Sequence, residues 1–491
     1  ALGAKSGLFG QWLLAERSRW NRLHHQLRLR LAAACIAERT LLAAGVAACE
    51  QVLEDEPTHE EAHRLKMHLL GLEGRRAEAR NQYAELSRIL RELGQAPSPE
   101  SDAVDEQIKS LREVMERNDI IIDAGNANYH DTVRRDAELS KTGLTFIGMG
   151  VSGGEEGARH GPSIMAGGLE SSYRRVENVL TAIAAKYKKS PCCAWVGTDG
   201  AGHFVKTMHN GIEYADMQMI AEIYGVMRDG LGMTASDIAR VFATWNSGKL
   251  NSYLIEITAK VLATVDDKTG KPLVDIIVDR AGQKGTGKWS VIEAQNLGVP
   301  ATTLEAAVAA RVLSSMKDER TRAAGLYKIK RKKLLPKSKT ALIRQLESAL
   351  YAAKIAAYAQ GFAVMEQASI EKGWNLPLGS IAAIWREGCI IRSQFLDLIT
   401  SAFRKSNGNL LMTAAFSGMM KDNHTALRKT VADAVLIGQP VPALSTALAY
   451  FDAYRQARGT ANLIQGQRDY FGAHTFERIN ESGAHRGNWT E

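Results

Sequence analysis

The stretch GHFVKTMHNGIEY, residues 202–214, combines an apolar pattern with a polar one. Its polar side chains recur at intervals of three and four positions, which places them on one face of a helix. These residues are Lys206, His209, Asn210, Glu213 and Tyr214. The opposite face is apolar. A polar stripe on such a helix predicts that the helix is packed inside the protein and lines a cleft.

Two residues of this stripe have the chemistry of an acid and a base. Lys206 and Glu213 are about 10 Å apart along a helix axis, so their side chains can flank a small substrate. A lysine acts as a base only when it is neutral, which near pH 7 requires its pKa to fall by roughly 3 units. Burial in a closed cleft would lower that pKa and would keep Glu213 protonated as the paired acid. A structural stripe of salt bridges is the alternative interpretation.

The sequence on either side of this helix differs in kind. Long helical patterns dominate after Ala201, whereas residues 119–123 and 144–147 are short apolar runs typical of buried parallel strands. We therefore predict a mainly α protein with a truncated α/β layer. Its expected parts are a helical solenoid module over residues 1–102, a partial Rossmann-type sheet over 103–200, and a large all-α domain over 201–491.

Two glycine-rich motifs resemble phosphate-binding loops. GMGVSG at residues 148–153 has the G-x-G-x-x-G spacing after a predicted strand, but the glycines that follow break the helix that a dinucleotide site needs. A loop whose backbone amides bind another anion is favoured over a dinucleotide site. GQKGTGK at residues 282–288 matches the start of a P-loop, yet Trp289 replaces the Ser or Thr that binds Mg²⁺. An anion-binding loop or a flexible surface turn remains.

The first hundred residues have a different composition from the rest. Arginine outnumbers lysine 12 to 2 there, and only +1 of the net charge of +8 lies in this part. A helix is expected to stop before Pro57 and to restart with Thr58 as its N-cap. Helical pairs of about 34 residues are typical of tetratricopeptide-like solenoids, which usually bind partners.

The motifs DEPTHEEAHRL (55–65), GRRAEA (74–79) and SPE (98–100) resemble the bacterial transcriptional activator domain. The resemblance covers about residues 10–101. The winged-helix part that precedes this domain in such regulators is absent here, so DNA binding is not implied. A helical spacer is the alternative interpretation.

The remaining composition narrows the class of protein. Five cysteines without framework spacing indicate reduced thiols in a cytoplasmic protein. No stretch approaches the ~18 consecutive apolar residues that a membrane helix needs, and the first residues contain no signal-peptide core. The basic run over residues 328–339 is expected to be a solvated loop, and nucleic-acid binding is not expected.

The C-terminal tail has a separate prediction. Its segment RDYFGAHT, residues 468–475, is predicted to clamp an anion and to dock on a neighbouring subunit.

Over about residues 103–491, the sequence closely resembles the decarboxylating 6-phosphogluconate dehydrogenases. The matching stretches are residues 121–126, 151–157, 202–206, 209–214, 282–289, 388–392 and 468–475. The resemblance implies a homodimer that oxidises 6-phosphogluconate with NADP, releasing CO₂ and ribulose 5-phosphate, a reaction of the pentose phosphate pathway. It implies that Lys206 removes the 3-hydroxyl proton and assists decarboxylation, and that Glu213 protonates the enediol.

The resemblance also implies a substrate site without a metal. The residues expected to hold the sugar acid are Asn126, Ser152, Gly153, Gly154, His209 and Asn210. Those expected at the phosphate end are Tyr214, Lys284 and Arg311, with Arg468 and His474 from the partner subunit. Asn126 would also face the cofactor.

The chain departs from this family at its beginning. The family opens with a strand, a G-x-G-x-x-G turn and an Asn-Arg pair that reads the 2′-phosphate, whereas residues 1–102 hold seven glycines and none in that spacing. We therefore expect the first half of the dinucleotide fold to be missing and the cofactor site to be compromised by a fusion. The alternative is a catalytically inert scaffold whose helical module recruits a partner.

Overall fold

The computed structural model describes residues 23–36, 39–73, 104–112, 114–283, 285–405 and 408–489, together with a few positions between 75 and 86. Lys284 therefore lies outside the described residues, as do most of residues 74–103. Within the described part, helices predominate and one four-stranded sheet is present. The predicted fold class is confirmed.

The N-terminal module is a packed group of helices. Residues 23–35 form one helix, which is followed by a 3₁₀ turn η1 (Arg39–Leu41) and by helices α2 (Leu42–Asp55) and α3 (Glu60–Leu72). Leu29, Val46 and Leu69 belong to a small apolar core that these helices share. The helix expected after Pro57 is present, but Thr58 is not its N-cap. His59 takes that position, and its ring accepts a hydrogen bond from the amide of Ala62.

A mixed sheet follows the module. Its strands lie in the order β1-β2-β3-β6, with β1 parallel to β2, β2 antiparallel to β3 and β3 parallel to β6. The strands are β1 (Ile120–Asp123), β2 (Thr145–Ser152), β3 (Ser163–Ala166) and β6 (Cys193–Trp195), beside a small ribbon of β4 (Lys186–Tyr187) and β5 (Ser190–Pro191). Both strands predicted from apolar runs are present, and the second extends to Ser152.

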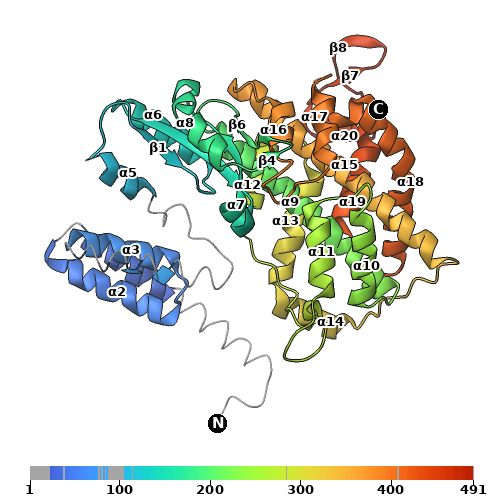
Figure 1. Ribbon diagram of the computed structural model, residues 1–491, viewed down its shortest axis with the longest axis horizontal. Coiled ribbons are helices and arrows are strands. Elements are labelled where there is room, and N and C mark those ends of the chain that lie inside the picture. Colours follow the sequence, from blue (N-terminus) through green and yellow to red (C-terminus); the bar gives the residue numbers. More distant parts are fainter. Residues whose placement is uncertain are drawn as a thin grey trace.

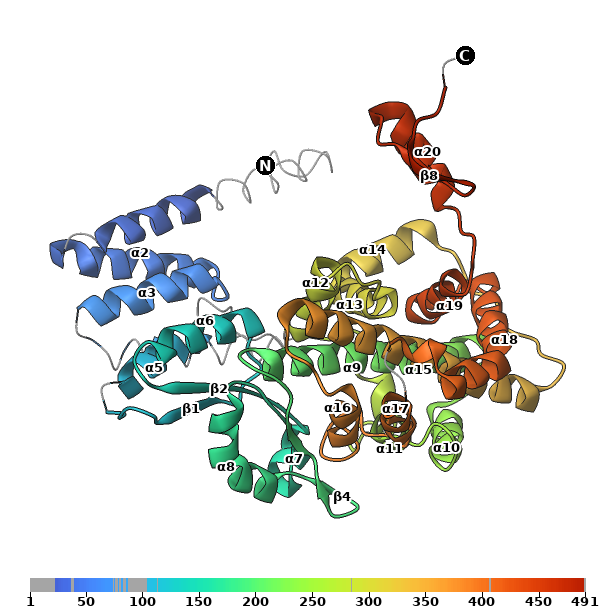
Figure 2. The same cartoon turned by 90° about the horizontal axis from the view of Figure 1, so that it is seen from above.

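Side-chain alternation along β2 determines which helix covers each face of the sheet. Ile147 and Met149 pack with α8, whereas Phe146 packs with α6 on the other face. Figure 2 shows α6 and α8 on opposite sides of the strands. The helices of this layer are α5 (Val104–Arg112), α6 (Tyr129–Ser140), α7 (Gly154–His160) and α8 (Glu170–Ile183).

The remaining chain is a helical domain built around two long helices, α9 and α15, which lie side by side (Figure 1). Its first half contains α9 (Ala201–Gly225), η3 (Val226–Gly230), α10 (Ala235–Asn246), α11 (Tyr253–Ala263), η4 (Leu273–Asp275), α12 (Thr286–Asn296), α13 (Thr302–Ser315) and α14 (Lys317–Tyr327). Its second half contains α15 (Lys339–Lys372), α16 (Leu378–Ile384), α17 (Phe395–Phe403), η5 (Leu410–Met412), α18 (Ala414–Leu436) and α19 (Pro442–Tyr454). A tail of α20 (Ala461–Gly472), β7 (Phe476–Arg478) and β8 (Glu481–His485) completes the chain.

The two central helices are joined by a buried ion pair. The ammonium of Lys354 on α15 donates to both carboxylate oxygens of Asp216 on α9, at 2.7 and 2.6 Å. Both side chains are almost fully buried. Because a buried charge without its partner is strongly unfavourable, this pair fixes the contact of α15 with the helix that carries the polar stripe.

We predict that Lys354→Met destabilises the helical domain by about 3–5 kcal/mol, because Asp216 would remain buried without its counter-charge. The shift of the urea denaturation midpoint, followed by tryptophan fluorescence, measures this effect. Lys260→Met is the control, since Lys260 forms an exposed pair with Glu256 on α11 and should leave the midpoint unchanged. Equal midpoints for the two variants would contradict the prediction.

Candidate active site

Helix α9 reaches the sheet at positions where both partners are glycine. A Cβ atom added at Gly150 of β2 would lie 2.4 Å from the Cβ of Lys206, and one added at Gly148 would lie 2.9 Å from Nδ1 of His203. A Cβ at Gly202 would lie 2.3 Å from the carbonyl oxygen of Gly148. The absence of side chains at these positions therefore lets α9 lie directly on β2.

This contact explains the G-x-G-x-x-G spacing at residues 148–153. Gly148 and Gly150 lie inside β2 and not in a turn, so the motif does not form a dinucleotide-binding loop. Its last glycine, Gly153, has φ of +134° and follows the strand, and Gly154 has φ of +58°. These two glycines redirect the backbone at the carboxyl end of β2 and open the short helix α7.

The predicted stripe on α9 forms a buried hydrogen-bond network. Nζ of Lys206 donates to Oδ1 of Asn210, and the same oxygen lies 3.1 Å from Nδ1 of His209. Nε2 of His209 lies 3.2 Å from the hydroxyl of Ser152 at the end of β2. Burial lowers the pKa of His209 well below its usual value, and the charge of Lys206 lowers it further. A neutral His209 thus joins the sheet to the helix at the centre of the site.

Burial changes the acid–base properties of the two outer groups in opposite directions. It lowers the pKa of Lys206, with the carboxyl group of Glu213 opposing the change. It raises the pKa of Glu213, against the opposing charges of Lys206 and Arg311. Oε2 of Glu213 lies 3.7 Å from Nδ1 of His209. Burial therefore shifts both groups of this helix face toward their uncharged forms.

The far end of the stripe meets the glycine-rich loop at residues 282–288. The guanidinium of Arg311 on α13 lies 4.2 Å above the ring of Tyr214 and donates to the carbonyl of Gly282. Gly285, with φ of +88°, precedes α12, and a Cβ on Gly287 would lie 2.7 Å from the Tyr214 ring. Tyr214, Arg311 and this loop are thus brought together.

Asn126 lies just beyond the carboxyl end of β1. The turn that presents it is closed by Asp123, whose Oδ1 accepts the amide hydrogen of Gly125 at 2.9 Å. Below this turn is the buried His203, one helical turn before Lys206, with Nδ1 2.7 Å from the Thr132 hydroxyl. Neither Asp123 nor His203 was predicted as part of the site. His203 lies in the stretch 202–214, three residues before Lys206, and this helical spacing could have identified it.

The wall of the site comes from the segment before α17. The rings of His209 and Trp385 meet edge to face at 5.3 Å, and the thiol of Cys389 donates to the carbonyl of Trp385. The carbonyl oxygen of Gly388 accepts the amide of Ser163 on β3. Residues 388–392 were recognised as a matching stretch, but the sequence did not predict that they connect the sheet to the helical domain.

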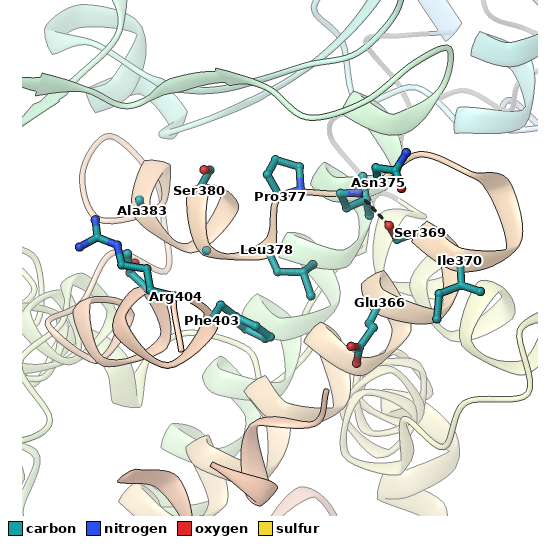
Figure 3. A pocket seen from close by; sticks show the side chains of 13 residues that line it. Glu366, Ser369, Ile370, Asn375, Pro377, Leu378, Ser380, Ala383, Phe403 and Arg404 are labelled. Carbon is teal, nitrogen blue, oxygen red and sulfur yellow. Dashed lines mark hydrogen bonds between the residues drawn. The ribbon is translucent and has the colours of Figure 1, made fainter. Parts of the chain in front are cut away.

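Two expected residues lie elsewhere in the described chain. Arg468 and His474 belong to the tail, which Figure 2 shows projecting away from the helical body. Arg468 bonds to Gln465 of its own helix, and the His474 ring contacts Phe471. A separate hollow of about 750 Å³ lies between α15, α16 and α17, with Glu366, Phe403 and Arg404 on its walls (Figure 3). None of the predicted site residues lines it.

Two kinds of feature are not found in the part of the chain that the structure describes. It contains no group of three or more His, Cys, Asp or Glu side chains placed to hold a metal ion. In the same described residues, no helix is both long enough and apolar enough to cross a membrane.

An α/β layer joined to a helical domain, with a buried lysine and a half-buried glutamic acid where the two meet, is the arrangement of a dehydrogenase that takes a proton and a hydride from a hydroxy acid. Comparison with known proteins identifies the family of dehydrogenases. Residues 202–489 match the 6-phosphogluconate dehydrogenase C-terminal domain, residues 77–197 match the NAD binding domain of 6-phosphogluconate dehydrogenase, and residues 2–109 match the bacterial transcriptional activator domain.

Individual relatives agree with these matches. The chain is 50% identical over 389 residues to the NADP(+)-dependent decarboxylating 6-phosphogluconate dehydrogenase of Bacillus subtilis, covering 79% of this chain and 83% of the relative. It is 48% identical to the NAD(+)-dependent enzyme of the same organism, with the same coverage. A Plasmodium falciparum 6-phosphogluconate dehydrogenase, solved with NADP+ and with 6-phosphogluconate, superposes with a TM-score of 0.77 at 42% identity, over 80% of this chain and 84% of that chain. The chain belongs to the 6-phosphogluconate dehydrogenase family.

We predict that Gly150→Ala disrupts the site from behind, because the new methyl group would collide with Lys206 and push α9 off the sheet. The expected loss of stability is about 1–3 kcal/mol, typical of an overpacked core. Thermal unfolding measures it. Gly418→Ala on α18 is the control, since nothing lies within 4 Å of the new atom and alanine favours the helix. A Gly150→Ala protein as stable as the control would contradict the packing argument.

Proposed function

We propose that this chain catalyses the oxidative decarboxylation of 6-phosphogluconate to ribulose 5-phosphate and CO₂, with NADP as the hydride acceptor. The observation that carries the proposal is the stripe on α9, in which Lys206, with a lowered pKa, and Glu213, with a raised pKa, flank a hydrogen-bonded His209 and Asn210. Residues 103–200 supply the sheet edge of the site and residues 201–491 its helices. The free, buried thiols support a reducing location such as the cytoplasm.

The substrate would lie along the stripe with its phosphate at the α12 end. Ser152, His209 and Asn210 offer polar atoms to the sugar acid, and Gly153 and Gly154, both with positive φ, turn the backbone at this end of the site. At the other end, Tyr214 and Arg311 meet the N-terminus of α12, where free amides and the helix dipole favour a phosphate. Lys284 and Asn126 complete this assignment, by family resemblance.

Lys206 acts first as a base. Its amine is buried, so the neutral form is populated more than in water and can accept the proton of the 3-hydroxyl group. A bound NADP would supply the hydride acceptor for the same carbon, and the oxidised substrate would be a 3-keto acid. The resulting ammonium of Lys206 then donates a hydrogen bond to the ketone oxygen and stabilises the enolate that forms when CO₂ leaves.

Glu213 acts last as an acid. Burial raises the pKa of its carboxyl group and so favours the protonated form, which can deliver a proton to C1 of the enediol and produce ribulose 5-phosphate. Lys206 is active as a neutral amine and Glu213 as a protonated carboxyl group, and near pH 7 in water each of these forms is the minor one. The rate should therefore fall when the pH drops below the pKa of Lys206 and also when it rises above the pKa of Glu213.

The described residues fit the substrate end of such a site better than the cofactor's phosphates. Asn126 and the backbone at residues 152–154 lie at the carboxyl ends of β1 and β2, where ligands of open α/β sheets bind. Among the described residues, β2 and β3 are each followed by glycines and a helix, but the first turns of these helices, α7 and α8, carry Glu155, Glu156 and Glu170, whose charges oppose a pyrophosphate. We therefore assign Asn126 and the backbone at residues 152–154 to one end of bound NADP.

We predict that Glu213→Gln lowers the exchange of the C1 proton of ribulose 5-phosphate in D₂O by at least about 100-fold, because general acid–base groups typically contribute 10²–10⁴. Proton NMR follows this partial reaction, which transfers no hydride. Lys206→Met should likewise abolish the exchange by removing the group that polarises the carbonyl. Glu256→Gln, at an exposed site on α11, is the control. Unchanged exchange in both site variants, with 6-phosphogluconate still bound, would refute the assignment.

A homodimer with exchanged tails is part of the proposal. The tail exposes large apolar side chains that a single chain leaves uncovered, namely Leu463, Ile464, Tyr470, Phe471 and Ile479. Buried Asp469 holds the tail together by accepting from Thr475, Gly487 and Trp489. A compact arm with an apolar surface is suited to a neighbouring subunit, where Arg468 and His474 would reach the substrate phosphate.

We predict that Arg468→Ala weakens 6-phosphogluconate binding by about 10- to 100-fold, the usual effect of losing a hydrogen bond to a charged group. Calorimetry measures the affinity. Arg478→Ala on β7 of the same tail is the control, because its partner is Glu481 and not the substrate. If dilution to the monomer leaves the affinity unchanged, the exchange of tails is wrong.

A scaffold function for the N-terminal module is the second candidate. Leu23, Leu27 and Leu31 form an exposed apolar stripe at four-residue spacing on its first helix, and their side chains are 47–66% exposed. Such a stripe suits a protein partner. If 6-phosphogluconate produces no heat of binding with the full chain, the scaffold candidate is favoured over the enzyme.

A further inference from the structure

His203 is a buried polar residue that the proposed reaction does not use. It lies on α9 one helical turn before Lys206, and it is 1% exposed. Its ring occupies the space in front of Gly148 on β2, where an added Cβ atom would lie 2.9 Å from Nδ1. Lys206 occupies the corresponding space in front of Gly150. The two side chains therefore share the contact of α9 with the sheet.

One nitrogen of the His203 ring is held by α6. Nδ1 lies 2.7 Å from the hydroxyl oxygen of Thr132, and this hydroxyl lies 3.3 Å from the carbonyl oxygen of Asn128, the N-cap of α6. The hydroxyl has one proton, which it donates either to Nδ1 or to the carbonyl oxygen. In both cases Nδ1 has a partner, so the ring is fixed relative to the first turn of α6.

The other ring nitrogen, Nε2, is buried and has no hydrogen-bond partner among the described residues. Oδ2 of Asp123, at the carboxyl end of β1, is also buried without a partner in the described part of the chain. Unpaired polar atoms are rare inside proteins, because they lose their hydrogen bonds to water without replacement. Two such atoms beside one site therefore require an explanation.

The strand register places Asp123 and His203 on the same face of the sheet. Asp123 pairs with Gly148 across β1 and β2, and the His203 ring stands over Gly148. Paired residues of neighbouring strands project to the same side of a sheet. Burial lowers the pKa of His203, whereas the carboxylate of Asp123 and the carbonyl groups of Gly125 and Asp123 raise it. The ring thus lies under the turn that follows β1.

This turn carries Asn126. Oδ1 of Asp123 accepts the amide hydrogen of Gly125 at 2.9 Å and closes the backbone just before Asn126. Arg135 approaches Oδ2 of Asp123 only to 3.8 Å, and its Nε donates to Asp105 at 2.7 Å. The ring of His203 is therefore a donor that remains available to support the turn from below.

We propose that His203 is a positioning residue, which supports the turn of residues 123–126 through Nε2 and so fixes Asn126 relative to Lys206. It does so in the tautomer in which Thr132 donates to Nδ1 and Nε2 carries the proton. The inference rests on the proposed function, in which Asn126 holds the sugar acid and faces the cofactor. The buried ring contacts no ligand, so its effect on binding passes through Asn126.

A matched pair of substitutions separates the two ring nitrogens. The side-chain amide of glutamine reaches the position of Nε2, whereas that of asparagine reaches only the position of Nδ1. We expect His203→Asn to weaken 6-phosphogluconate binding by about 10-fold, the effect of losing one hydrogen bond, and His203→Gln to weaken it by less than about 3-fold. In His203→Gln, the Thr132 hydroxyl keeps the Asn128 carbonyl as its acceptor.

Calorimetry measures the affinity of both variants, and thermal unfolding verifies that they are folded. His68→Asn, at an exposed position of α3, is the control and should bind like the unaltered chain. The reverse order of the two His203 variants would assign the effect to the bond with Thr132 and would overturn the inference. Equal affinities of the two variants would also overturn it.

A double-mutant cycle tests whether His203 acts through Asn126. In a chain that carries Asn126→Ala, His203→Asn should cause no further loss of affinity, because the turn then presents no amide side chain to the substrate. Two losses that multiply would overturn the inference.

Asp123→Asn makes the same test from the turn and leaves the core under α9 unaltered, so it does not depend on the folding of the His203 variants. Oδ1 can still close the turn, but the atom in place of Oδ2 becomes a donor and faces the ring without a charge. We expect the affinity to fall by about 10-fold, and to fall no further than this when Asn126→Ala is also present. Unchanged affinity in Asp123→Asn would overturn the inference.

Amide hydrogen exchange provides a readout without substrate. Loss of the support under the turn should speed exchange at Gly125 by at least about 10-fold in His203→Asn and leave it nearly unchanged in His203→Gln. Equal exchange in the two variants would overturn the inference. Failure of the proposed function is separate, since it is detected by absent 6-phosphogluconate binding and absent C1 exchange in the unaltered chain, while Gly125 still reports on the turn.

Discussion

The direct contact of α9 with β2 is the constraint on which the rest of the site depends. Because Gly148, Gly150 and Gly202 have no side chains, the helix backbone lies against the strand and Lys206 is placed beside the end of the sheet. Any larger residue would move the helix outward by the width of a methyl group. The network from Ser152 through His209 to Asn210 spans this contact and could not form across a wider gap.

Burial created by this contact has two consequences for chemistry. It removes water from Lys206 and Glu213, so each is pushed toward its uncharged form, which is the form that proton transfer requires. Burial also makes an unpaired charge unfavourable on the next turn of α9. There Asp216 is paired with Lys354, and this ion pair connects α9 to α15. Burial thus acts in two ways on one helix: it shifts the pKa values of Lys206 and Glu213 at the site, and it is offset by an ion pair behind the site.

The position of the helical module in the sequence bears on the size of the sheet. The helical module occupies the position that a dinucleotide-binding half would take in the sequence, and the sheet has four strands in the described part. The substrate half is nevertheless ordered as a unit, because β1 is held by β2 and by the apolar contacts of Ile121 with Leu139 and Phe146. These contacts hold the sheet end of the candidate site in place within the described part of the chain.

Local pattern in the sequence was sufficient for the helices, the two apolar strands and the polar stripe, because periodicity and strand hydrophobicity are properties of neighbouring residues. It did not predict the role of the 148–153 glycines, which depends on a helix fifty residues later, nor the positions of His203, Trp385 and Asp123, which meet only after the chain has folded. The N-cap of α3 also differed by one residue, since Thr58 and His59 are both able to cap. The sequence by itself determined the chemical groups and their helix face. Only the tertiary structure decided the direction of their pKa shifts and the order of the described strands, because burial and strand neighbours arise from contacts between distant segments.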